Sequence, residues 1–128
     1  MVERNRVTFF GGAEMLSNAD VTFYSTKDYT RYTAHKAYFA DNRGQTVKKN
    51  GIEISDVVSI YLYTDEYVPS VGDMVVRGIV DFEFNNTSQK TISESMKEFR
   101  EMFSEFAVVK SVSDYKFGGL PHIEITAR

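Results

Sequence analysis

The strongest constraint on the fold of this chain is the run from Val57 to Tyr63, in which the side chains alternate in character. Every second residue from Val58 is aliphatic, and Ser59, Tyr61 and Tyr63 occupy the positions between and after them. Successive side chains of a β-strand point to opposite faces. The run therefore predicts a strand that buries its aliphatic side and presents tyrosines on the reverse.

The same period of two, or a composition that favours strands, recurs along the chain. It predicts further strands at residues 21–24, 33–40, 74–84, 108–112 and 121–127, separated by turn-forming residues at 41–44, 48–51 and 69–73. Gly78 lies inside the 74–84 run, which predicts a bulge or a sharp bend there. One side of that strand should carry Met74, Val76, Val80, Phe82 and Phe84.

One segment has a helical period instead. Its apolar residues recur at spacings of three and four, and they are Ile92, Met96, Phe99, Met102, Phe103 and Phe106. This pattern predicts an amphipathic helix near residues 91–106 whose methionines and phenylalanines pack on the core. Thr91, followed three residues later by Glu94, predicts a capping box at the start of the helix.

The order of these elements is several strands, one helix and two final strands. It predicts a mainly β fold of the α+β class, namely a small antiparallel β barrel or sandwich with one amphipathic helix. The length of 128 residues fits one domain. We expect a single β-rich domain over residues 18–128, preceded by an N-terminal arm or extra strand over residues 1–17.

Composition narrows the classes of function. The net charge is −3, which does not provide the broad positive field that holds nucleic acids. The chain has no cysteine, so it has neither disulfides nor a Cys-ligated zinc site. Glu3, Arg4 and Arg6 occupy a region where a signal peptide needs an apolar core, and no apolar run approaches the ~20 residues of a membrane-spanning helix. We therefore expect an intracellular protein with no membrane partner.

The residue pattern contains no recognisable catalytic or metal-binding arrangement. His35 and His122 are far apart in sequence; we expect His35 at the surface and His122 in a local hydrogen bond. The carboxylates of the helix form a diffuse solvated face without a Glu-x-x-His spacing. We therefore expect no enzymatic activity, no cofactor, no metal and no small-molecule substrate.

Tyrosines are the first candidates for a binding surface, because tyrosine is enriched at protein interfaces. The candidates are Tyr24, Tyr29, Tyr32, Tyr61, Tyr63 and Tyr67, and ordinary cross-strand packing is the competing interpretation. An OB-like module that binds nucleic acid or a peptide is an alternative function. Against nucleic acid, Tyr61 and Tyr63 are flanked by acidic rather than basic residues.

Four stretches, taken in order, carry a family resemblance. They are ADVTFY at 19–24, Asn50-Gly51-Ile52 leading into 56–62, Tyr67-Val68-Pro69 before Val71-Gly72-Asp73 and the strand at 74–78, and the closing segment 109–125 with Gly118-Gly119 and Pro121-His122. From about Asn18 onward the chain resembles the small neck proteins of tailed bacteriophages and prophages. These form the head–tail connector or stopper group, which includes "minor capsid" proteins.

This resemblance implies a small β barrel that assembles in the virion neck without catalytic residues. The implied partners are other neck, portal or tail proteins, together with further copies in a ring homo-oligomer, and the isolated chain can be monomeric. The implied location is the virion neck or the host bacterial cytoplasm. Loops of polar composition at 41–50 and 64–70 would make the contacts. The predicted contact residues are Asp41, Arg43, Lys48, Lys49, Tyr63, Asp65, Glu66 and Tyr67.

Overall fold

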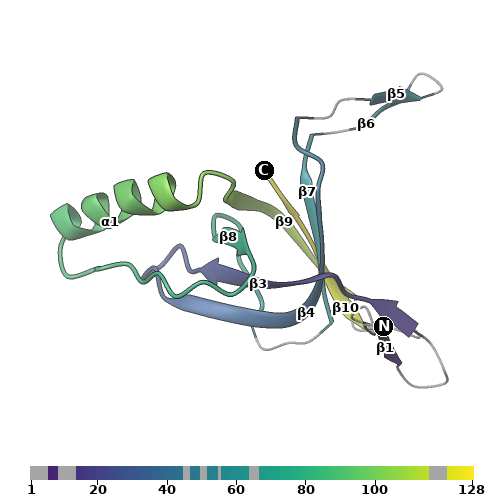
Figure 1. Cartoon of the computed structure of the whole chain (residues 1–128), viewed down its shortest axis with the longest axis horizontal. Coiled ribbons are helices and arrows are strands. Elements are labelled where there is room, and N and C mark those ends of the chain that lie inside the picture. The colour runs from purple at the N-terminus through teal and green to yellow at the C-terminus, as the bar shows by residue number, and fades with distance from the viewer. Residues whose placement is uncertain are drawn as a thin grey trace.

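The computed structural model describes residues 6–8, 14–44, 47–49, 52–54, 56–63, 67–115 and 121–128. The strands are β1 (Arg6–Thr8), β2 (Glu14–Leu16), β3 (Ala19–Tyr24), β4 (Arg31–Asp41), β5 (Val47–Lys49), β6 (Ile52–Ile54), β7 (Val58–Leu62), β8 (Met74–Arg77), β9 (Ala107–Tyr115) and β10 (His122–Ala127), and the helix is α1 (Gln89–Met102). Figure 1 shows α1 lying to one side of the strands.

Six of the strands form a closed antiparallel barrel in the order β10-β7-β4-β3-β8-β9. This arrangement confirms the predicted fold class of a small antiparallel β barrel with one helix. The strands predicted at 21–24, 33–40, 108–112 and 121–127 correspond to β3, β4, β9 and β10. Of these, β3, β4 and β9 are longer than predicted. Both β4 and β9 curve around the barrel and pair with different neighbours along their length.

A bulge in β4 makes this curvature possible. The register shifts where β4 pairs with β3, so that His35 and Lys36 lie opposite the single residue Asp20. Lys36 has a φ of 59°, and its backbone N–H donates to the Asp20 carboxylate at 2.9 Å. An extra residue in one strand bends it and increases its twist. The N-terminal part of β4 therefore pairs with β3, and its C-terminal part pairs with β7.

The barrel interior is filled by apolar side chains from all six strands. They are Val21, Phe23, Ala34, Ala37, Phe39, Val58, Ile60, Leu62, Val75, Ala107, Val109, Ile123, Ile125 and Ala127. In β7 the buried residues alternate with half-buried ones, as the sequence predicts. The aliphatic side of β7 therefore faces the interior, and Tyr61 lies on the outer face.

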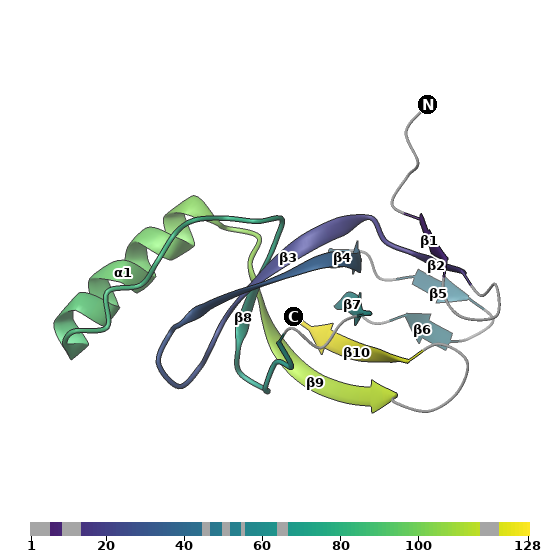
Figure 2. The same cartoon turned by 90° about the horizontal axis from the view of Figure 1, so that it is seen from below.

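A second hydrophobic cluster lies outside the barrel, between β3, β8 and α1. Its buried members are Tyr24, Met74, Val76 and Phe99, and they are packed by Tyr29, Val80, Phe82, Phe84, Met96, Phe103, Phe106 and Val108. Figure 2 shows α1 beside the β3–β8 side of the barrel. We call this set the outer cluster. It provides the contacts that hold the helix against the barrel.

The predicted strand at 74–84 is wrong beyond Arg77, where β8 ends. Gly78 has a φ of 91°, which is where the predicted bend occurs. The Thr22 hydroxyl donates to the Gly78 carbonyl at 2.7 Å and accepts from the Val80 N–H at 3.1 Å, so the departing chain is held to β3. The predicted sidedness is nevertheless correct, because Val80, Phe82 and Phe84 join the outer cluster.

The helix begins and ends earlier than the sequence predicts. Ser88 is the N-cap: its side chain accepts from the Thr91 N–H at 3.2 Å, while the Thr91 hydroxyl accepts from the Ser88 N–H at 2.9 Å. The capping box is therefore formed by Ser88 and Thr91, not by Thr91 and Glu94. The helix ends at Met102, which is 60% exposed rather than buried in the core.

Two short hairpins complete the topology. β1 pairs with β2 within residues 1–17, and β5 pairs with β6, each pair forming its own two-stranded sheet. In Figure 1 the β5–β6 pair lies beyond the start of β7. Within the ranges given above, there is no helix with the length and apolar character needed to cross a membrane.

Candidate interaction surfaces

The registers of β4, β7, β10 and β9 bring aromatic residues together on the outside of the barrel. Tyr38 of β4 pairs with Tyr61 of β7, which pairs with Glu124 of β10. His122 of β10 pairs with Tyr115 of β9. Tyr63 follows β7 directly and lies on the same side. We call Tyr38, Tyr61, Tyr63, Tyr115 and His122 the aromatic patch.

His122 lies at the centre of the aromatic patch. Its ring stacks on Tyr115 with centroids 5.1 Å apart and an interplanar angle of 18°, and it lies 5.6 Å from the Tyr61 ring and 6.4 Å from the Tyr63 ring. The His122 Nε2 atom is 2.9 Å from a Glu124 carboxylate oxygen. The local hydrogen bond predicted for His122 is confirmed.

The aromatic patch is only partly covered by the rest of the chain. Tyr115 is 47% exposed, and Tyr38, Tyr61, Tyr63 and His122 are half-buried. Burial raises the pKa of the Tyr63 hydroxyl, with smaller contributions from Tyr61 and Tyr38. Aromatic rings with hydroxyls that stay hydrated are the side chains that protein interfaces favour.

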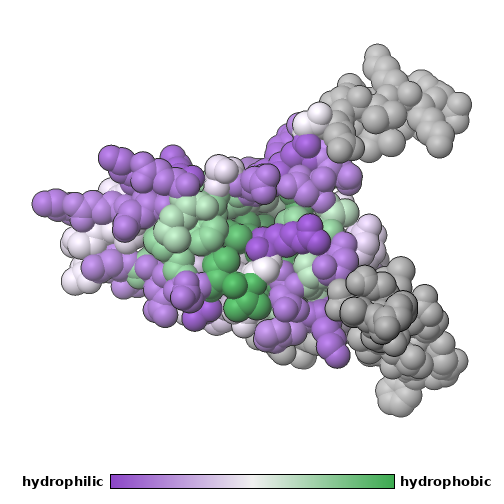
Figure 3. Space-filling view, viewed as in Figure 1, coloured by the Kyte–Doolittle hydropathy of each residue, from purple (hydrophilic) through white to green (hydrophobic). Residues whose placement is uncertain are grey.

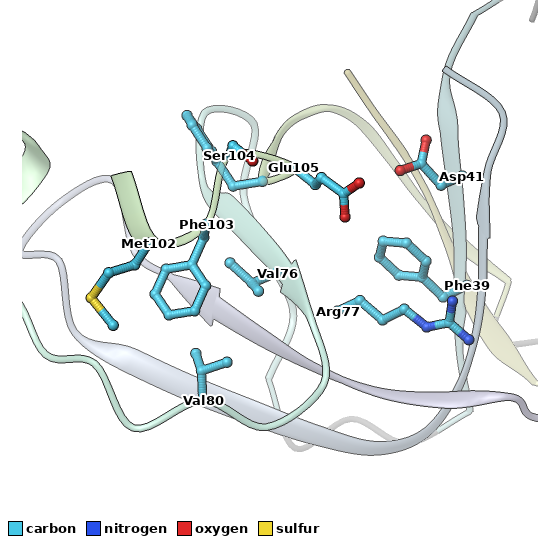
Figure 4. Close-up of a pocket in the computed structure, with 10 residues that line it drawn as sticks. Phe39, Asp41, Val76, Arg77, Val80, Met102, Phe103, Ser104 and Glu105 are labelled. Atoms are coloured by element: carbon cyan, nitrogen blue, oxygen red, sulfur yellow. The ribbon is translucent and has the colours of Figure 1, made fainter. Parts of the chain in front are cut away.

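A second surface feature is a groove at the end of α1. Its apolar walls are Phe39, Val76, Val80, Met102, Phe103 and Phe106, its polar residues are Asp41, Arg77, Ser104 and Glu105, and its volume is about 350 Å³. Figure 4 shows most of these side chains around the hollow between the end of α1 and β4. Figure 3 shows apolar surface over the same part of the molecule. We call it the helix-end groove.

Arg77 crosses the groove beside Phe39. Its guanidinium carbon lies 5.7 Å from the centroid of the Phe39 ring, a cation–π arrangement. An Arg77 Nη2 atom also lies 3.5 Å from the Asn18 carbonyl oxygen. Arg77 is exposed to solvent, and its guanidinium has more N–H donors than this single bond uses.

Asp41 and Arg43, two predicted contact residues, bind each other at one edge of the groove. The Arg43 guanidinium donates to both oxygens of Asp41, at 3.0 Å from Nε and 2.8 Å from Nη2. It also donates to the Phe106 carbonyl at 2.8 Å and to the Glu105 carbonyl. The hydrogen bonds between the two side chains lower the pKa of Asp41 and raise the pKa of Arg43. The pair thus fastens the end of β4 to the segment between α1 and β9.

Tyr67 lies away from both surfaces, in an internal network around Asp73. The Tyr67 hydroxyl donates to Asp73 at 2.5 Å, and the Tyr67 ring stacks on Tyr32 at 4.1 Å. Asp73 is fully buried and also accepts from the N–H groups of Thr26 and Ser70, each at 3.0 Å. Burial, together with the Asp73 bond, raises the pKa of Tyr67. The sequence did not indicate this buried carboxylate.

The remaining predicted contact residues lie in other parts of the chain. Tyr63 belongs to the aromatic patch. Lys48 and Lys49 lie in β5 rather than in a turn, and their side chains are outside the described residues. Asp65 and Glu66 are also outside the described residues.

Tyr24, one of the candidate contact tyrosines, is fully buried in the outer cluster, so for this residue the competing interpretation of ordinary packing is correct. Its hydroxyl donates to the Phe82 carbonyl at 2.7 Å, and burial raises its pKa to about 12. The sequence-based list of candidate tyrosines missed Tyr38 and Tyr115, which lie in the aromatic patch. Strand alternation in the sequence could have indicated Tyr38 and Tyr115 as outward-facing residues. Their grouping in one patch could not be predicted, because the strands that pair with theirs come from distant parts of the chain.

In the part of the chain that the structure describes, no three residues of the His, Cys, Asp and Glu types gather as they would to hold a metal ion. The fold and surfaces define a class: a small closed antiparallel β barrel with one docked helix and an aromatic outer face. The match to known families is more specific. A family model described as "Family of unknown function (DUF6751)" matches residues 16–128, and the chain belongs to this family. No curated protein and no solved structure matches the chain.

Proposed function

We propose that this protein is a structural component of the neck of a tailed phage or prophage particle, similar to a head–tail connector or stopper. In this proposal it acts by binding neighbouring proteins at the junction between portal and tail, and it catalyses no reaction. Its partners are other neck, portal or tail proteins and further copies of itself.

The observation that carries the proposal is the aromatic patch. Tyr38, Tyr61, Tyr63, Tyr115 and His122 come from four adjacent strands and lie on the outer face of the barrel, away from its core. A folded chain gains little from leaving these rings partly in water, whereas a partner that covers them removes from water the part of each ring that is still exposed. A fully buried aromatic side chain loses about 150–250 Å² of accessible surface in all. An aromatic surface with hydroxyl groups at its rim is typical of a protein contact site.

The fold gives further support. The resemblance to phage neck proteins implies a small β barrel, and the chain folds as one. In this barrel β4 pairs with β7 only over Tyr38–Asp41, and β9 pairs with β8 only at Ala107 and Val108. Contacts with partners can therefore come from its outer face, its loops, its appended elements and these strand edges. Such contacts can be individually weak and still stabilise a particle, because an assembly repeats them at high effective concentration.

The first test measures the solution mass of the purified portal ring by light scattering, with and without this protein. We expect the protein to add mass to the ring, and we expect Tyr61→Ser to lower the amount bound. Val71→Ser is the matched control, because Val71 is 61% exposed and lies in the loop before β8, outside the aromatic patch. A ring mass that stays unchanged at high micromolar protein would contradict the proposal.

The alternative function is tested on the same preparation. An OB-like module should raise the fluorescence anisotropy of a labelled single-stranded oligonucleotide, and raised salt should reverse the effect. We expect no change in anisotropy. The gene neighbourhood is an independent check, since a neck protein should be encoded beside portal, capsid and tail genes.

A further inference from the structure

We propose that the aromatic patch of one copy docks into the helix-end groove of a second copy of the same chain. This inference rests on the proposed assembly function and names the partner of the aromatic patch. The contact joins two different surfaces, so it runs head to tail.

The two surfaces lie on opposite faces of β4, because Tyr38 belongs to the patch and the next residue, Phe39, lines the groove. β7 begins at Val58, which pairs with Asp41 at the edge of the groove, and it ends at Leu62, which pairs with Ile123 next to the patch. One copy can therefore offer its patch to one neighbour and its groove to another. Contacts between unlike surfaces close into a ring or continue as a filament, whereas a two-fold dimer would pair like with like.

The shapes of the two surfaces are complementary. The groove is a hollow of about 350 Å³ with phenylalanine, valine and methionine walls. Tyr115, at the end of β9, is the most exposed ring of the patch. The next row of outer-face residues is Ala40, Ser59, Thr126 and Ser111, which pair across the same four strands. These side chains are small, so the wall of a neighbouring groove could approach the sheet closely beside the projecting rings.

One charge on each surface is complementary to one on the other, namely Arg77 in the groove and Glu124 on the patch. The groove carries the exposed guanidinium of Arg77 and the carboxylate of Glu105. The patch carries the Glu124 carboxylate beside the His122 imidazole. When the patch enters the groove, Glu124 can accept from Arg77, a charge-assisted pairing that is strengthened as water is excluded. Within the groove, Asp41 is already neutralised by Arg43 and does not oppose this approach.

The expected strength follows from the size of the patch. Four strands spaced at ~4.8 Å and three rows of outward residues cover roughly 300 Å². Stable interfaces bury about 800 Å² per partner. The self-contact should therefore be weak in dilute solution and should populate only at high local concentration, as on a template. A measurement that traps the transient contact is needed.

Disulfide trapping suits this chain because it has no native cysteine. Tyr115→Cys places a thiol on the patch, and Met102→Cys places one at the groove; both positions are exposed, which favours retention of the fold. The two variants are mixed under mild oxidation, and dimer formation is followed by non-reducing electrophoresis. We expect the mixed disulfide to form at least ~10-fold faster than the dimer from Tyr115→Cys mixed with Glu98→Cys, an exposed position on α1.

Charge exchange then tests the orientation. Arg77→Glu is added to the Met102→Cys chain, and Glu124→Arg is added to the Tyr115→Cys chain. Each change alone should slow the cross-link, and the two together should restore it, because the swapped pair can form again. Circular dichroism of each variant verifies that the fold is retained.

Two outcomes overturn the self-contact. One is equal cross-linking with the Glu98→Cys control, and the other is faster homodimer formation by Tyr115→Cys alone, which would indicate a two-fold contact between patches. The portal-ring experiment separates this inference from the proposed function. A protein that binds the portal ring but fails the cross-link keeps the assembly function and loses the self-contact. A protein that cross-links as expected but adds no mass to the ring keeps the self-contact and loses the neck assignment.

Discussion

Replacing Phe99 with alanine removes the side chain that holds α1 to the barrel. Phe99 is fully buried and is the apolar helix residue at the centre of the outer cluster. Its ring centroid lies between 5.1 and 5.7 Å from those of five other rings, which belong to Tyr24, Phe82, Phe84, Phe103 and Phe106. These partners come from β3, from the segment before α1 and from the segment after it, so the substitution weakens all three attachments.

The expected loss in the free energy of unfolding follows from the burial of the Phe99 side chain. A fully buried Phe→Ala substitution lowers the free energy of unfolding by about 3–5 kcal/mol, including the cavity it leaves. Tilted and edge-to-face ring pairs add to area burial, so the loss for Phe99 should reach at least the middle of that range, at about 4 kcal/mol. A domain of this size has about 5–15 kcal/mol in total. With a urea m-value of about 2 kcal/mol/M, the unfolding midpoint should fall by about 2 M.

The assay is urea unfolding followed by far-ultraviolet circular dichroism for α1 and by tyrosine fluorescence for the barrel. Met102→Ala is the matched control, because this residue of the same helix is 60% exposed and should cost less than about 0.5 kcal/mol. A loss below about 1 kcal/mol for Phe99→Ala, or equal losses for the two variants, would refute the argument that the outer cluster anchors the helix.

Three further predictions concern polar networks. Asp73→Ala should lower the free energy of unfolding by about 2–4 kcal/mol in denaturant titrations, because two backbone N–H groups and the Tyr67 hydroxyl lose their acceptor. Asp73→Asn should recover part of the loss, and an unchanged stability of Asp73→Ala would contradict the role of this network. The lowered pKa of Asp41 contributes stability that is present above its ordinary pKa of 3.8 and is lost as the pH falls through the lower folded value; Arg43→Gln should weaken this acid dependence in melts between pH 2 and 6, and an unchanged profile would exclude the pair as its source. Because the pKa of Tyr24 is raised from 10.0 to about 12, stability should be complete below pH 10 and should fall as the pH rises toward 12; Tyr24→Phe should flatten that alkaline limb in urea titrations, and an equally steep limb would show that other groups cause it.

Much of the fold could be predicted because strand and helix periods are local. The alternation in β7 identified which side of the strand is buried, and the spacing around Phe99 identified the side of the helix that docks. Even where the strand assignment failed after Gly78, the alternation still predicted which side chains face the outer cluster. Side-chain period survives the loss of sheet pairing, because an extended segment alternates whether or not its backbone groups bond to a neighbour.

The site was less predictable because it depends on pairing between distant segments. Tyr63 was identified from its own strand, but its grouping with Tyr115 and His122 requires the registers of β9 and β10. Arg43 was predicted to contact partners from its place in a polar loop, and the structure adds that its guanidinium binds carbonyl groups near the start of β9, more than 60 residues away along the chain. No local pattern signals such a bond.

By itself, the sequence determined the fold class, the buried side of β7 and the buried side of the helix, since each depends on side-chain periods a few residues long. Only the tertiary structure decided that the barrel closes, that the buried Asp73 ties its loops together, and that five aromatic rings from four strands form one outer patch. The physical reason is register: the partner of each strand is set by the packing of the whole core, and a shift of one residue would turn every tyrosine to the other face.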